Sequence, residues 1–153
     1  MKLIEKVSYI EDVTLISLHD SPADIKLIAG IFQKISDAGI DVDMISQAPP
    51  NGQHSSLSFT VNDEDFGRIL EIAAELRTLN PELKISVSSG NCKISVFGDA
   101  MKGTPGVAAK VFTAVAKANA DIRMITTSEV DISLLVVKAD VDNAIRAIES
   151  CFE

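Results

Sequence analysis

The sequence predicts an α+β fold in which one β-α-β-β-α-β unit is used twice. Stretches of the chain repeat at an offset of 80 positions, and within each copy the apolar spacing switches between about 3.6 and 2, the periods of a helix and a strand. In addition, the second copy lacks its last strand, while an extra strand precedes the first copy. We therefore expect two ferredoxin-like modules, each an antiparallel four-stranded sheet with two helices on one face.

The repeat is clearest in the first helix of each copy and in the strand that follows it. Phe32 and Phe112 stand 80 positions apart in their helices. The same offset continues into the next segment, where residues 41–46 (DVDMIS) match residues 121–126 (DIRMIT). One unit has therefore been used twice along the chain.

The first copy contains all six elements of the unit. The first helix ends near Gly39, a residue suited to a helix C-terminus. The inward residues of the second helix are Phe66, Ile69, Leu70 and Ala73. A turn is predicted at residues 48–52, which contain Pro and Asn-Gly. In chain order we expect a strand at 13–18, a helix around 28–35, strands at 42–47 and 57–61, a helix at 64–79 and a strand at 84–87.

The second copy stops one strand short. Its strands are expected at 93–97, 122–127 and 132–137, and its helices around 107–115 and 141–152. Residues 3–9 are strand-like and have no place in the first copy. Because an unpaired strand leaves backbone groups unsatisfied, we expect this segment to complete the second copy. The predicted first module is thus 11–89, and the second is 1–10 plus 90–153.

Composition narrows the possible partners. The chain has 22 acidic and 14 basic residues, for a net charge of -8, which disfavours binding to nucleic acid or to a membrane surface. No apolar run has the length of a signal peptide or a membrane span, so we expect a cytoplasmic protein.

Cys92 and Cys151 belong to no Cys/His cluster, so we expect two reduced, buried thiols with no metal and no cofactor.

Two stretches of the second copy contain residues suited to binding a small ligand. In the loop at 98–107 we expect Thr104 to cap the following helix and Pro105 to lie in its first turn. Free amides at a helix start can hold a carboxylate, although the same pattern also fits a capped helix with no ligand. Residues 122–133 place hydroxyls and a carboxylate between two paired strands.

Together, residues 101–112 (MKGTPGVAAKVF) and 124–133 (MITTSEVDIS) resemble the second ACT module of aspartokinases. Residues 39–47 (GIDVDMISQ) are similar to a strand of the first module, so the resemblance spans essentially the whole chain. In that family such modules bind lysine or threonine and inhibit a separate catalytic domain. By position, the resemblance implies that the effector's backbone groups meet Met101, Thr104, Pro105, Gly106 and Val107, and that its side chain lies beside Thr127, Ser128 and Glu129. Glu129 would suit the ammonium of lysine.

The first copy departs from this pattern. Lys26 stands where the offset places Gly106, and its side chain would either block an amino acid or pair with the carboxylate of one. The weaker candidates for effector binding in this copy are Asp20, Asp41, Asp43 and Gln47.

We therefore expect a regulatory protein without catalytic residues of its own. A nucleotide-binding domain does not fit beside two modules in 153 residues, and no Walker-type loop is present. The expected partners are an amino-acid effector, a second copy of the chain in a homodimer, and a separate aspartokinase catalytic chain. The alternative is an ACT-type dimerisation scaffold that has lost effector binding.

Overall fold

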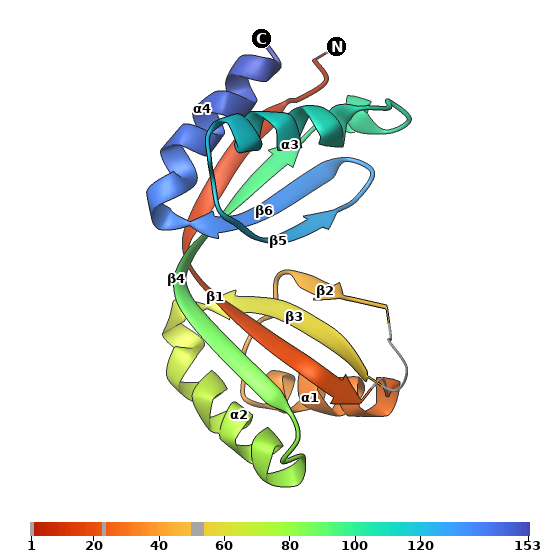
Figure 1. Ribbon diagram of the computed structural model, residues 1–153, viewed down its shortest axis with the longest axis vertical. Coiled ribbons are helices and arrows are strands. Elements are labelled where there is room, and N and C mark those ends of the chain that lie inside the picture. The colour runs from red at the N-terminus through yellow and green to blue at the C-terminus, as the bar shows by residue number, and fades with distance from the viewer. Residues whose placement is uncertain (1, 23, 50–53) are drawn as a thin grey trace. The chain divides into compact units, whose positions relative to one another are not determined.

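The chain forms two compact units, each with its own hydrophobic core. The computed structural model describes residues 2–22, 24–49 and 54–153. Unit 1 comprises Met1–Glu11 and Gly90–Glu153, and unit 2 comprises Asp12–Ser89. In chain order the helices and strands are β1 (Lys6–Pro22), α1 (Ile25–Asp37), β2 (Ile45–Gln47), β3 (His54–Asn62), α2 (Phe66–Leu79), β4 (Lys84–Phe97), α3 (Val107–Lys117), β5 (Ile122–Thr127), β6 (Asp131–Val137) and α4 (Val141–Cys151) (Figure 1).

Two strands are longer than the sequence predicts. The predicted strands 3–9 and 13–18 belong to one strand, β1, and the predicted strands 84–87 and 93–97 belong to one strand, β4. Polar residues interrupt the apolar alternation between the members of each pair, but the strand continues through them. Asp12 in β1 and Gly90 in β4 have positive φ angles of 60° and 74°, which mark the points where the two units divide.

The six strands are hydrogen-bonded in the order β2-β3-β1-β4-β6-β5. This order differs from the two separate four-stranded sheets that the sequence predicts, because β1 and β4 each contribute to both units. The pairs of β3 with β1 and β2, and of β6 with β4 and β5, are all antiparallel. The fold is therefore α+β with an antiparallel sheet.

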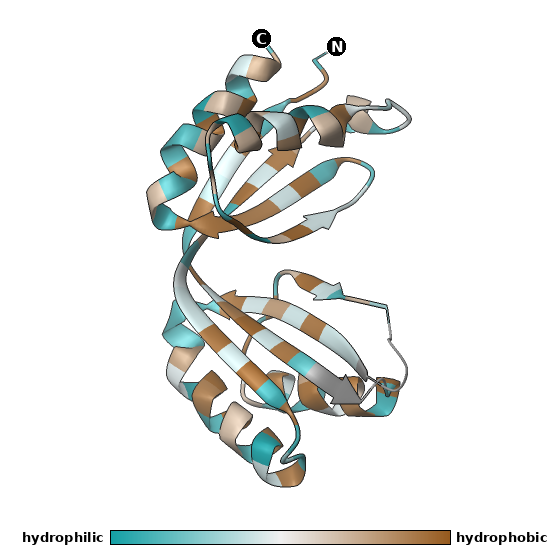
Figure 2. Ribbon diagram, in the orientation of Figure 1, coloured by the Kyte–Doolittle hydropathy of each residue, from teal (hydrophilic) through white to brown (hydrophobic). Residues whose placement is uncertain are grey.

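In unit 2, β3 lies between β1 and β2. Its register with β1 runs from Val13 opposite Asn62 to Leu18 opposite Leu57, so alternate residues of both strands face the helices. Figure 2 shows this alternation of apolar and polar residues along β1 and β3. The core residues from these two strands are Ile16, Leu18, Leu57, Phe59 and Val61. β2 is shorter than predicted, since residues 42–44 lie outside the strand.

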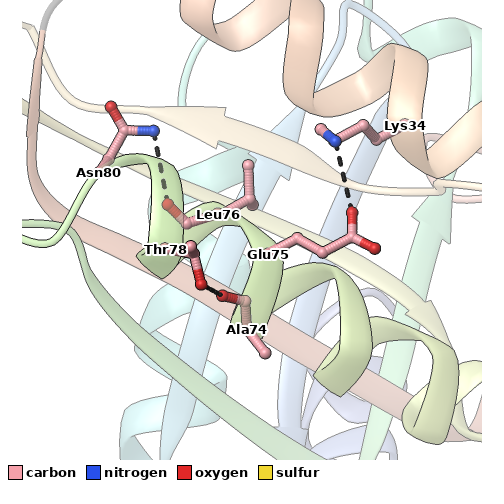
Figure 3. Close-up of polar contacts among 6 residues, drawn as sticks. All are labelled: Lys34, Ala74, Glu75, Leu76, Thr78 and Asn80. Atoms are coloured by element: carbon pink, nitrogen blue, oxygen red, sulfur yellow. Dashed lines mark hydrogen bonds and ion pairs between the residues drawn. The ribbon is translucent and has the colours of Figure 1, made fainter.

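The helices α1 and α2 cover the core of unit 2. Gly39 follows the C-cap residue Ala38 of α1 with φ 74°, and its amide donates to Ser36 O at 2.9 Å, so the helix ends near Gly39 as predicted. Lys34 Nζ of α1 lies 3.3 Å from Glu75 Oε2 of α2 (Figure 3). The prediction that Leu70 faces the core is wrong, because this residue is 44% exposed.

In unit 1, β6 lies between β4 and β5, and α3 and α4 cover one face of these strands (Figure 1). The core residues shared by the two helices and the strands include Ile94, Val111, Leu134 and Ile148, all fully buried. Of the two free cysteines, Cys92 is buried in this core and Cys151 on α4 is half-buried. Among the residues described, no helix has the length and apolar character needed to cross a membrane.

Candidate functional site

The loop between β4 and α3 is compact and anchored by Met101. After β4 the backbone forms a 3-10 turn, η2 (Asp99–Met101), and the Met101 amide donates to Gly98 O at 3.1 Å. Thr104 N in turn donates to Met101 O at 3.0 Å. The Met101 side chain is 7% exposed and belongs to the core of unit 1, so this predicted site residue fixes the loop to the core.

The helix after this loop begins later than the sequence predicts. α3 starts at Val107 with Gly106 as its N-cap residue, and no side chain of the described residues caps it. The prediction that Thr104 is the cap and that Pro105 lies in the first turn is therefore wrong. Gly103 and Gly106 have φ angles of 74° and 89°, which let the loop continue past the proline before the helix begins.

The side chain of Thr104 instead holds the loop together. Its hydroxyl donates to Ala100 O at 2.8 Å. The backbone amides at the start of α3 therefore lack a side-chain acceptor from the described part of the chain, and Thr104, Pro105 and Gly106 around them are exposed. An uncapped helix start of this kind can accept a carboxylate from outside the chain. Val107 itself is 6% exposed and fixes the helix start to the core.

The turn between β5 and β6 carries the other three predicted residues. Thr127 ends β5 and pairs with Ile132 of β6. Ser128 N donates to Asp131 O at 2.8 Å, and Ser128 Oγ accepts from Val130 N at 3.3 Å, so the hydroxyl stabilises the turn. Thr127, Ser128 and Glu129 are all exposed.

The loop and the turn contact each other within unit 1. Gly98 N donates to Val130 O at 2.9 Å, and Lys102 Nζ lies 3.4 Å from Glu129 Oε2. Both side chains of this ion pair are mostly exposed, so it contributes about 0–1 kcal/mol to stability. Glu129 is predicted to meet the ammonium of a ligand, and here it meets the ammonium of Lys102. A ligand would have to displace this weak pair.

A groove of about 630 Å³ runs along α3 and α4 beside the start of α3. Its wall is mostly apolar, with two lysines. Of the predicted effector residues, Gly106 lines it. The lining residues are Gly106, Ala109, Lys110, Thr113, Ala114, Lys117, Ala147, Ser150 and Cys151.

The corresponding helix start in unit 2 is built differently. Asp24 is the N-cap of α1, and its carboxylate accepts from Lys26 N at 2.9 Å. This carboxylate belongs to the chain and occupies the place that a ligand carboxylate would need. Lys26, at the position equivalent to Gly106, is exposed.

The weaker candidates in unit 2 other than Asp20 lie between α1 and β2 and at the end of β2. Asp41 and Asp43 are exposed between α1 and β2, and Asp43 N donates to Thr60 O at 3.0 Å. Gln47 is exposed at the end of β2, where it pairs with Leu57. The side chain of Asp20 lies outside the described residues.

The sequence does not predict that Leu3 and Glu5 contact the β4–α3 loop. Glu5 Oε2 accepts from Asp99 N at 2.7 Å, and Gly98 lies directly against the backbone of Leu3. These contacts join positions 94 or more apart, so no local pattern reveals them. Within the described residues, no three His, Cys, Asp or Glu side chains gather into a group that could hold a metal ion.

Comparison with known proteins gives the family. A model of the ACT domain matches residues 94–152, which include the loop, the turn and both helices of unit 1. The structure of the regulatory subunit of aspartate kinase from Thermus thermophilus, in its ligand-free form, is 32% identical with a TM-score of 0.88, over 99% of this chain and 100% of that one. The chain belongs to the aspartate kinase regulatory family.

Other members of this family are similar over most of the chain. A chain in the structure of aspartokinase alpha and beta subunits is 31% identical with a TM-score of 0.86, over 97% of this chain and 98% of that one. The aspartokinase of Thermus thermophilus is 35% identical over 150 residues, which cover 92% of this chain and 34% of that protein. The chain spans about a third of the length of the curated aspartokinases that it matches, between 33% and 37%. Its 153 residues correspond to the regulatory part of aspartokinases and include no kinase domain.

Proposed function

We propose that this chain senses an amino acid of the aspartate family, lysine or threonine, and regulates a separate aspartokinase catalytic chain. The two units are two ACT modules in this proposal, and unit 1 holds the effector. The regulatory role follows from the family, whereas the identity of the effector and its place in unit 1 are our inference.

One observation carries the placement of the effector. The β4–α3 loop and the β5–β6 turn meet through the Gly98–Val130 hydrogen bond, next to a helix start that no described side chain caps. The effector carboxylate would accept from the first amides of α3, at Val107 and the two residues after it, beside Thr104, Pro105 and Gly106. The effector side chain would extend toward Thr127, Ser128 and Glu129, and the Glu129 carboxylate favours lysine over threonine.

Unit 2 supports the same reasoning by contrast. Its helix start is already capped by Asp24, so an added carboxylate would meet a like charge instead of free amides. We therefore expect unit 2 to bind an effector weakly or not at all. This difference favours one effector site in the chain, in unit 1.

Self-association is the second part of the proposal. Ile45 on β2 and Ile125 on β5 occupy equivalent positions in the two copies, and they are 52% and 41% exposed. Both strands are last in the hydrogen-bonded order, so each offers unpaired backbone groups beside an exposed apolar side chain. We propose that a second copy of the chain covers at least one of these edges. The structure of alpha and beta subunits of an aspartokinase supports a further, catalytic partner.

Calorimetric titration tests the effector site. We would titrate the chain with lysine and threonine, then with methionine and other amino acids, and follow its size by chromatography. The site variant is Gly106→Asn, because Asn tolerates a positive φ and an added Cβ meets nothing within 4 Å, so the fold should persist. Gly90→Asn is the matched control, since Gly90 also has a positive φ in open space and lies away from the loop.

The results separate effector sensing from simple dimerisation. We expect saturable binding of one amino acid, a loss of at least tenfold in affinity for Gly106→Asn and no change for Gly90→Asn. Unchanged affinity in the Gly106 variant would show that the site is misplaced. A dimer that binds no amino acid at all would favour the dimerisation scaffold.

A further inference from the structure

The segment Leu3–Glu5, which precedes β1, lies directly on the β4–α3 loop of unit 1. Glu5 N donates to Phe97 O at 2.8 Å, so backbone pairing with the end of β4 extends one residue beyond the start of β1. Leu3 and Ile4 also pack against the core of unit 1. We call residues Leu3–Glu5 the N-terminal strap.

The backbone of the strap lies so close to Gly98 that any side chain at this position would overlap it. A Cβ added to Gly98 would lie 2.0 Å from Leu3 O and 3.2 Å from Ile4 Cα. These are backbone atoms, so no side-chain rotation can relieve the overlap. The φ of Gly98 is -172°, an extended conformation open to any residue, so the close approach alone requires glycine at this position.

The strap also supplies a missing cap. No side chain within the loop caps the turn η2, and the Asp99 amide at its start donates to Glu5 Oε2 at 2.7 Å instead. A carboxylate that accepts from a backbone amide at the start of a turn makes a charge-assisted hydrogen bond, which is stronger than a neutral one. Glu5 therefore fixes the first residue of the turn that carries Met101.

Gly98 connects the strap to both halves of the site. Its amide donates to Val130 O in the β5–β6 turn, and its carbonyl accepts from the Met101 amide. A movement of Leu3 or Glu5 thus acts on the loop and on the turn at the same point. Unit 2 differs here, because the repeat offset places the buried Leu18 at the position of Gly98.

We propose that Glu5 is a positioning residue for the effector site, and that the N-terminal strap couples effector binding to the position of the chain before Glu5. The proposal rests on the proposed function. The loop holds its ligand-binding shape only while Glu5 caps Asp99 and Leu3 lies on Gly98. By linkage, an effector that stabilises this shape also holds the strap in place, and pulling the strap away weakens effector binding by the same factor.

The first experiment needs no ligand. We would compare amide hydrogen exchange in the chain with that in Glu5→Ala, Glu5→Gln and Glu149→Ala. Glu149 is an exposed glutamate that borders the same segment, and its removal changes the charge equally without touching the loop. We expect exchange at Asp99, Met101 and Thr104 to be about tenfold faster in Glu5→Ala, near the original rate in Glu5→Gln, and unchanged in Glu149→Ala. Equal exchange rates in Glu5→Ala and the unaltered chain would show that Glu5 does not cap the turn.

The second experiment adds lysine or threonine as the probe, whichever binds. Affinity should fall about tenfold in Glu5→Ala and recover in Glu5→Gln, and the bound amino acid should slow exchange at the Glu5 and Asp99 amides. Full affinity in Glu5→Ala would overturn the coupling even if the cap is real. If neither amino acid binds the unaltered chain, the proposed function fails, while the exchange rates without ligand still decide whether Glu5 caps the loop.

Discussion

Replacing Gly98 by alanine should destabilise the protein, because the added methyl group overlaps the backbone of Leu3. The Cβ would lie 2.0 Å from Leu3 O, whereas real Cβ atoms essentially never come within 3.0 Å of such an atom, so the two backbones must move apart by about 1 Å. The hydrogen bonds from Glu5 N to Phe97 O and from Asp99 N to Glu5 Oε2, at 2.8 and 2.7 Å, would then exceed about 3.5 Å and be lost.

The size of the effect follows from these two bonds. A neutral hydrogen bond contributes roughly 0.5–1.5 kcal/mol and one to a charged group roughly 1.5–3 kcal/mol, so Gly98→Ala should cost about 3 kcal/mol. For a domain of this size that corresponds to a decrease in Tm of about 6–12 °C. Thermal unfolding followed by circular dichroism, with urea unfolding alongside, measures both quantities.

Gly30→Ala and Gly67→Ala are the matched controls. They make the same chemical change in α1 and α2, where an added Cβ meets nothing within 4 Å. Alanine is the better helix former, so each control should stabilise by about 0.5–1 kcal/mol. A Tm for Gly98→Ala within about 1 °C of the unaltered chain would refute the close approach of the strap to the loop.

Three further predictions concern other parts of the two units. Asp24→Ala removes the cap of α1 and should cost about 0.5–2 kcal/mol in urea unfolding, whereas Asp24→Asn should keep most of that stability; equal losses would contradict capping. Lys102→Ala should change stability by less than about 1 kcal/mol, and calorimetry should show lysine affinity that is unchanged or higher. Glu129→Gln should lower the affinity for lysine. A lower lysine affinity in the Lys102 variant would place the ligand elsewhere. A thiol reagent should label half-buried Cys151 in the folded chain and reach Cys92 only in denaturant, and equal labelling rates would contradict the burial of Cys92.

The helices and strands themselves were largely predictable, because their apolar periodicity is local. β5 has the predicted bounds, 122–127, and α1 ends near Gly39 as expected. The predictions failed where the backbone does not follow apolar periodicity. β1 and β4 continue as strands through polar residues, and the glycines at 103 and 106 delay the start of α3 beyond Pro105.

For the candidate site, too, the sequence predicted the local motifs but not the features that depend on the backbone conformation. The loop and the turn were identified from their sequence motifs, and the structure shows that the two are in contact through Gly98, Val130, Lys102 and Glu129. No pattern in the sequence indicated that Asp24 would cap α1 while α3 would start without a cap, although both loops contain residues suited to capping. Which side chain reaches a helix start depends on the φ angles of the loop before it.

By itself, the sequence determined the type and order of the elements, the repeat and the family. The elements and the family follow from patterns a few residues long, and the repeat follows from the alignment of the two copies. Only the tertiary structure decided that Glu5 caps a turn 94 positions away and that Leu3 requires a glycine at 98. Both contacts depend on how the first strand pairs with β4. That pairing is set by the packing of the whole unit, which no local stretch of sequence encodes.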